Sequence, residues 1–339
     1  MSNENVYSAA QVAQYLDHIG LPQSFHPSAG PKLDIHYLTT LFTHQITTVP
    51  YENLQIHYSQ THTVDLDPQV LFTKIVTNNR GRGGYCMETA LFFKHILHAL
   101  GFADAYTAGV RIRLRGPDGV PAGPYIGFVH LVIILTLEHD GTRYALDVAF
   151  GGDGPTKPLP LIEDLVHHNG LGTQEIRLTR GFQPDQTYRG PGASRKWIYQ
   201  YRNRPQQEWN SFYAFDPDFE FGEPDFAVMS HFASTSALSM QSFTPLAIRF
   251  LRGTTTGQEE ENENDGERTE KWEKKVRVVG KVMMVNGLVK RNMGGKTELV
   301  RTCVTEAERV AALREYFGIL LTDEEVAGIK GRVPELGRA

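Results

Sequence analysis

The sequence predicts an α+β fold with a helical first part, an antiparallel β middle and a mixed C-terminal part. Apolar residues recur at helical spacing through the first hundred residues, up to Gly101. Beyond it, runs of β-branched and aromatic residues are joined through Asp140-Gly141, a dipeptide typical of hairpin turns. Helix-capping pairs return after residue 300, behind further strand-like runs. We therefore expect three consecutive parts, 1–101, 102–215 and 216–339.

The composition is that of a folded protein without a nucleic-acid or membrane partner. The chain has 339 residues, enough for about two domains, with 40% hydrophobic and 22% charged residues. Its net charge of −5 lacks the positive excess of nucleic-acid and anionic-membrane binders. Two cysteines are too few for a disulfide framework, and neither a secretory signal nor an apolar run of about 18 residues is visible. We expect a cytoplasmic protein; its oligomeric state is left open.

Four helices are expected in the first part, each from a local start signal. Ser8 and Gln11 form a capping box before an apolar stripe that ends near Gly20. Asp34 caps a second helix, and Asp67-Pro68 combines a cap with proline at the first helical position. A glycine-rich turn over 80–85 leads into the fourth helix, which begins at Cys86 and ends before Gly101.

Paired strands and two capped helices are expected after residue 101. An acidic polar tract, part of a predicted insertion near 258–270, is expected to be a solvated loop. The predicted strands are 128–137 with 142–149, 197–201 with 208–213, and 275–285 with 288–292, and the predicted late helices follow Thr305 and Thr322.

Cys86 is the residue with the most informative setting. It stands at a predicted helix N-terminus, where unpaired N–H groups and the helix dipole favour a thiolate. Arg80 and Arg82 are expected to add positive charge nearby. The alternative is a small buried hydrophobe, and position alone leaves both interpretations open. Cys303 has no comparable setting.

A nucleophilic cysteine needs a base, and His130 with Asp147 is the pair that the strand pattern favours. His95 and His98 lie too far along the Cys86 helix to reach its first turn, and without a third ligand they predict no metal site. A two-residue turn at Asp140-Gly141 places Asp147 opposite Ile134, on the same face as His130. The remaining stagger of about 13 Å means that direct contact needs a bulge, a bend or an earlier end to the pairing.

Five ordered segments resemble the arylamine N-acetyltransferase family. The three catalytic ones are Arg82-Gly-Gly-Tyr-Cys-Met-Glu88, Phe128-Val-His130 and Leu146-Asp-Val-Ala-Phe-Gly-Gly152, and segments 15–21 and 49–54 agree upstream. The chain length and the C-terminal insertion are most similar to fungal members. The resemblance implies a helical bundle, a central antiparallel β-barrel and a C-terminal α/β lid around a cysteine-protease-like core.

The resemblance implies a Cys-His-Asp triad of Cys86, His130 and Asp147. Cys86 would take an acyl group from acetyl-CoA or malonyl-CoA and pass it to an arylamine, arylhydroxylamine or hydrazine. The coenzyme would be a cosubstrate, with no permanently bound cofactor and no metal. This implies a role in xenobiotic metabolism.

Further residues take roles only through the resemblance. Phe150 would line the acceptor pocket, and Glu52 would pair with Arg82 to brace the catalytic turn. The positions expected near the coenzyme are Gly127, Val129 and Phe232.

The chain departs from the family pattern at Thr89-Ala90, where asparagine is common at the second position, and at Ala149, where glycine is common. Two alternatives stay open: a papain- or transglutaminase-like cysteine hydrolase, and a catalytically silent relative that binds coenzyme A or small amines.

Overall fold

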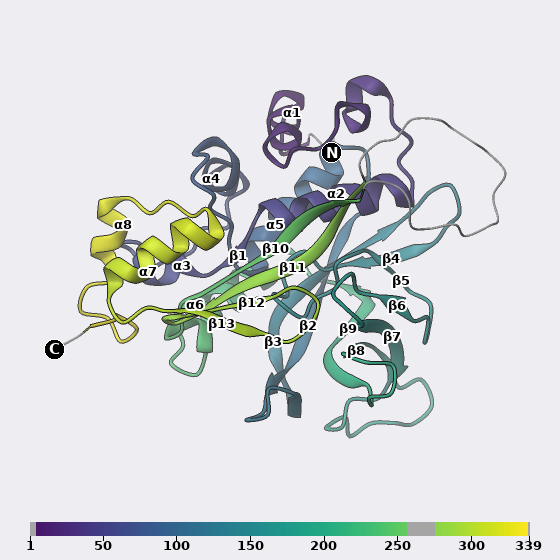
Figure 1. Cartoon of the computed structure of the whole chain (residues 1–339). Helices are drawn as coiled ribbons and strands as arrows, with labels where there is room; N and C mark the ends of the chain where they lie inside the picture. The colour runs from purple at the N-terminus through teal and green to yellow at the C-terminus, as the bar shows by residue number, and fades with distance from the viewer. Residues whose placement is uncertain (1–4, 256–274, 338–339) are drawn as a thin grey trace.

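The computed structural model describes residues 5–255 and 275–337 (Figure 1). The acidic tract and the predicted insertion near 258–270 lie outside these described residues. No helix among the described residues is long and apolar enough to cross a membrane.

The four helices predicted in the first part are present, with the predicted caps. They are α1 (Ala9–His18), α2 (Ile35–Thr48), α4 (Pro68–Phe72) and α5 (Cys86–Ala99). Ser8, Asp34 and Asp67 each accept a hydrogen bond from a backbone N–H of the first turn. The structure adds a short α3 (Leu54–Tyr58) and a π-helical turn, Thr73–Thr77, behind α4.

The helix that starts at Cys86 lies in the middle of the molecule. It packs against α1, α4 and one long strand, β3 (Pro121–Thr136). Met87, Phe92 and Ile96 on its different sides are fully buried. Because α5 is surrounded by protein, its first turn is held in a single place.

The middle of the chain forms an eight-stranded antiparallel sheet in the order β5-β4-β3-β2-β9-β8-β7-β6. The other strands are β2 (Tyr106–Arg115), β4 (Arg143–Leu146), β5 (Leu159–Pro160), β6 (His167–His168), β7 (Glu175–Gly181), β8 (Lys196–Arg202) and β9 (Asn210–Glu220). The expected barrel needs correction, because in the described part of the chain β5 and β6 remain the two edges. Both edge strands have only two residues, too few to close the sheet by pairing, so it is an open half-barrel.

The β3–β4 hairpin is present, but its predicted register was wrong by two residues. Ile134 faces Ala145, and the turn closes on Leu137 and Thr142 instead of directly around Asp140-Gly141. The loop is therefore longer than two residues, with Gly141 at φ +69°. A shift of two residues leaves every side chain on its predicted face.

A second, five-stranded antiparallel sheet follows the order β1-β10-β11-β12-β13. Its strands are β1 (Tyr51–Glu52), β10 (Leu246–Thr255), β11 (Lys275–Val285), β12 (Leu288–Asn292) and β13 (Glu298–Thr302). β1 comes from the first hundred residues, which the sequence analysis did not foresee. The late helices α7 (Glu306–Ala312) and α8 (Asp323–Gly328) carry the predicted caps, and α6 (Glu223–Thr235) precedes them. The division at 101 and 215 stays a prediction.

Candidate active site

The turn before Cys86 is built from glycines that lie against neighbouring backbone. A Cβ on Gly83 would lie 1.8 Å from the carbonyl oxygen of Pro50, a separation that no side chain tolerates. The backbone N–H of Glu52 donates to the carbonyl of Gly84 at 3.0 Å. The turn is therefore joined to β1, and Cys86 follows as the first residue of α5.

The structure brings Cys86, His130 and Asp147 together. His130 Nε2 lies 2.9 Å from Asp147 Oδ2, and Cys86 is close enough to His130 to interact with its ring electrostatically. The three side chains are buried, with residue exposures of 5%, 3% and 3%. A thiol, an imidazole and a carboxylate in this order form the chain of contacts that nucleophilic cysteine catalysis requires.

Two backbone features close the gap that the sequence analysis left between His130 and Asp147. The two-residue register shift brings Asp147 nearer along the sheet, and the β3–β4 pairing ends at Leu146. The backbone at Asp147 is therefore outside the β3–β4 pairing and can turn away from the strand direction. The Oδ1 atom of Asp147 accepts from the N–H of Ala149 at 3.1 Å. On the other side of β3 the pairing skips Val129, an irregularity of the kind that turns side chains toward active sites.

The charge on Asp147 sets the protonation of His130. Burial by itself lowers the pKa of a histidine, but the Asp147 charge and hydrogen bond, with a smaller contribution from Cys86, raise the pKa of His130 to about 10. His130 is therefore an imidazolium at neutral pH. The ring of Tyr213 on β9 lies 6.0 Å from the His130 ring, between centroids.

Arg80 and Arg82 do not supply the free positive charge that was expected near Cys86. Arg82 Nε donates to Glu52 at 2.9 Å, so the bracing pair implied by the resemblance is formed. Arg82 Nη1 and Arg80 Nη1 each donate to Glu325 at 2.5 Å. Because carboxylates compensate both guanidinium groups, the positive field at Cys86 comes from His130 and the helix N-terminus.

Of the four other residues with an expected role, two lie beside His130 or Cys86 and two are exposed. The Phe150 ring lies 5.1 Å from the His130 ring, and the Val129 carbonyl lies 3.5 Å from Cys86 Sγ. Gly127 is exposed on β3, with open space where a Cβ would stand. Phe232 lies on α6 and is 42% exposed. The roles of all four stay predictions.

Several residues beside Cys86 were missed by the sequence analysis. Phe226, Met229 and Ala233 on α6 belong to the apolar cluster that surrounds Cys86. Tyr85 is tied to α6 by a 2.5 Å hydrogen bond between its hydroxyl and that of Ser230. The α6 residues are more than a hundred positions from Cys86, and no spacing rule connects them to it.

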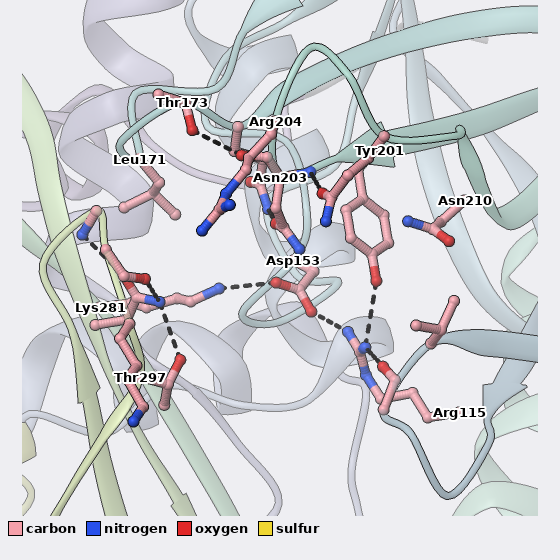
Figure 2. A pocket seen from close by; sticks show the side chains of 18 of the residues that line it. Arg115, Asp153, Leu171, Thr173, Tyr201, Asn203, Arg204, Asn210, Lys281 and Thr297 are labelled. Atoms are coloured by element: carbon pink, nitrogen blue, oxygen red, sulfur yellow. Dashed lines mark hydrogen bonds and ion pairs between the residues drawn. The ribbon is translucent and has the colours of Figure 1, made fainter.

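A cavity of about 850 Å³ lies between the two sheets (Figure 2). On its wall Asp153 is paired with Lys281 from β11 and with Arg115 from β2, and Figure 2 shows the three side chains in a row. Arg115 lies over the Phe212 ring, which contacts Phe150 at 4.5 Å. The cavity is thus connected to His130 through successive aromatic rings. Within the described ranges, no three or more His, Cys, Asp or Glu side chains are grouped to hold a metal ion.

The fold resembles solved arylamine N-acetyltransferases along nearly its whole length. The enzyme from Mycobacterium abscessus superimposes with a TM-score of 0.72 at 21% identity, covering 96% of this chain and 95% of that one. The Mycobacterium marinum enzyme in complex with CoA gives 0.68 at 23% identity, covering 95% of this chain and 98% of that one. At 21% and 23% identity, this structural similarity shows that the fold is shared.

Sequence comparison extends the likeness to the family. An N-acetyltransferase family model matches residues 34–282. An N-malonyltransferase of Fusarium pseudograminearum (strain CS3096) is 32% identical over 97% of this chain and 94% of its own. Human arylamine N-acetyltransferase 1 is 33% identical over 41% of this chain and 43% of its own. With the family model matched over more than half its length, the chain belongs to the arylamine N-acetyltransferase family of acyltransferases.

Proposed function

We propose that the protein transfers an acyl group from acyl-coenzyme A to an arylamine, arylhydroxylamine or hydrazine, through a thioester on Cys86. The observation that carries the proposal is the buried chain of contacts from Cys86 through His130 to Asp147. An imidazolium next to a thiol stabilises the thiolate, which is both a good nucleophile and a good leaving group.

The reaction runs in two steps with one shared intermediate. The Cys86 thiolate attacks the thioester carbonyl, and the bond between the acyl carbon and the coenzyme sulfur breaks. His130 gives its proton to the departing coenzyme thiolate, which leaves the acyl-enzyme and a neutral imidazole. The acceptor nitrogen then attacks the acyl carbon and gives its proton to His130. The Cys86 thiolate departs, and the imidazolium is restored with its orientation kept by Asp147.

The surroundings of Cys86 suit this chemistry. The first backbone N–H groups of an α-helix have no partner within the helix, and at the start of α5, which begins at Cys86, they can stabilise negative charge that develops on a carbonyl oxygen bound beside the sulfur. Leu131, Phe226 and Met229 surround the thiol with apolar groups. Such a setting disfavours water as the acceptor and so protects the thioester from hydrolysis.

Malonyl-CoA is a second candidate donor, alongside acetyl-CoA. The relatives that align over 94% to 97% of this chain are N-malonyltransferases. The human and rabbit arylamine N-acetyltransferases 1 match only 41% and 35% of it. Similarity over the whole length includes the parts that shape the donor site, which favours testing malonyl-CoA first.

Intact-mass spectrometry after incubation with each acyl-CoA tests the proposal. We expect one acyl adduct, located on the peptide that contains Cys86, and its loss when an arylamine such as aniline or a hydrazine is added. The faster of acetyl-CoA and malonyl-CoA identifies the donor. No adduct from either donor would support the silent relative, and cleavage of a peptide amide without acyl-CoA turnover would support the hydrolase.

A further inference from the structure

The C-terminal part of the chain lies directly on the turn that leads to Cys86. The N–H of Leu320 donates to the carbonyl of Arg80 at 2.9 Å. A Cβ on Gly81 would lie 2.1 Å from the carbonyl oxygen of Gly318, and both glycines have positive φ. This contact joins residues about 240 positions apart and excludes any side chain at Gly81.

Glu325 forms the polar half of this contact. It is the third residue of α8, and its Oε2 accepts from the N–H of Thr322 at 2.7 Å in the capping box. The same carboxylate receives Arg80 and Arg82, each at 2.5 Å. α8 is itself packed on α3, where a Cβ on Gly328 would lie 2.1 Å from the Tyr58 carbonyl oxygen (Figure 1). The helix that carries Glu325 is therefore held in place against α3.

Arg82 connects Glu325 to the turn that leads to Cys86. Its residue exposure is 2%, and its guanidinium lies between Glu325 on one edge and Glu52 on the other. On the far side, Glu88 accepts from Lys74 at 2.6 Å and from the N–H of Tyr85 at 3.0 Å. The six-charge cluster consists of Glu52, Lys74, Arg80, Arg82, Glu88 and Glu325. It encloses the segment that ends at Cys86 with three cations and three carboxylates.

We propose that Glu325 is a positioning residue, which holds Arg82 and the 80–85 turn so that Cys86 Sγ stays in contact with His130. Glu325 touches none of the reacting atoms. Without its carboxylate, one edge of a buried guanidinium loses its charged partner, and the side chains of Arg80 and Arg82 are no longer joined to α8, while Glu52 still holds the other edge of Arg82. A small displacement of Sγ from His130 then lowers the rate of acylation. The inference rests on the proposed acyl transfer through Cys86.

Glu325→Gln, with Glu324→Gln as the matched control, tests the inference. Both substitutions neutralise a carboxylate in the first turn of α8, but Glu324 is exposed and does not contact the catalytic turn. The cluster borders a cavity of about 430 Å³ lined by Arg82 and Glu325, so water from the cavity can reach the edge of Arg82 that loses its carboxylate, and the Gln variant is expected to fold.

Three readouts separate positioning from simple stabilisation: the single-turnover acylation rate, the pH profile of Cys86 alkylation by iodoacetamide, and the thermal midpoint. For Glu325→Gln we expect acylation about tenfold to a hundredfold slower and an alkylation profile moved to higher pH. Glu324→Gln should match the wild type in all three. Glu325→Asp keeps the charge on a shorter arm and should restore part of the rate.

Wild-type acylation and alkylation in folded Glu325→Gln, with only a lower thermal midpoint, would overturn the inference. If Glu325→Gln does not fold, Glu325→Asp decides: a lower thermal midpoint with a wild-type rate and profile would overturn the inference, because the contact would be weakened without any effect on Cys86. Failure of the proposed function is distinct. It would appear as no acylation of the wild type by either donor, while the alkylation profiles would still report whether Glu325 positions Cys86.

Discussion

Replacing Asp147 by asparagine should remove the imidazolium on which Cys86 depends. Asparagine keeps the size of the side chain and can still accept from the N–H of Ala149, but it carries no charge. Without that charge, the burial of His130 is left as the largest influence, so the pKa of His130 should fall from about 10 to below its ordinary value of 6.5.

The size of the effect follows from these pKa values. At pH 7 a group with a pKa of about 10 is protonated in all but roughly one molecule in a thousand. At the same pH, a group with a pKa below 6.5 is protonated in less than about a quarter of the molecules. Loss of a positioned acid–base partner in its working state lowers rates by on the order of 10²- to 10⁴-fold. We expect a decrease in single-turnover acylation within that range.

The pH profile of Cys86 alkylation provides the assay. In the wild type, His130 stays protonated between roughly pH 6 and 9, because its pKa is about 10. The alkylation profile of Asp147→Asn should lie at higher pH than that of the wild type, because the imidazolium beside Cys86 is lost over this span. Asp140→Asn is the control, since Asp140 is in the exposed turn of the same hairpin and also accepts from a backbone N–H. A wild-type profile in Asp147→Asn would refute the assigned protonation of His130.

Four other substitutions test the site and the turn. Cys86→Ser should lower acyl transfer by on the order of a thousandfold or more with an unchanged thermal midpoint, because an alcohol ionises far less than a thiol; retained turnover would remove Cys86 from the mechanism. Glu52→Gln should lower the free energy of unfolding at pH 7 by on the order of 3 kcal/mol, since the guanidinium and ammonium groups around Glu52 outweigh burial and hold its pKa at about 2. That contribution is present above pH 4.5 and is lost as the pH falls toward 2, so urea titrations of the two proteins should converge in acid. Glu88→Gln should lower the free energy of unfolding at pH 7 by less than Glu52→Gln does. Burial raises the pKa of Glu88, so the contribution of this side chain to stability declines as the pH rises. Equal decreases in the free energy of unfolding for Glu52→Gln and Glu88→Gln, measured by urea titration, would contradict this. Gly81→Ala should destabilise by about 1–3 kcal/mol, since alanine is strained at φ +65° and meets the backbone of Gly318; an unchanged midpoint of urea unfolding would speak against the close contact.

Features that depend on near neighbours in the chain were predictable. Ser8, Asp34, Thr305 and Thr322 cap helices where expected, because each satisfies a backbone donor only two or three residues away. The start of α5 at Cys86 follows from the same local rules. The family resemblance added the identities of the candidate triad, whose catalytic role stays a prediction; the structure places His130 Nε2 2.9 Å from Asp147.

The hairpin shows where local rules stop. Side-chain alternation correctly placed His130 and Asp147 on one face, since parity survives a two-residue slip. The register itself depends on the length of the turn, and its closure at Leu137 and Thr142 had no distinct signal in the sequence. The same limit explains the barrel that proved to be an open half-barrel.

The sequence by itself determined which groups can react and where helices begin, because capping, periodicity and the helix dipole act over a few residues. Only the tertiary structure decided what surrounds Cys86: β1 paired with β10, α6 over the thiol, and Glu325 against Arg82. These contacts join segments about 140 to 240 residues apart. Burial in a shared interior, with the need to pair each buried charge, selects them, and no pattern along the chain encodes that pairing.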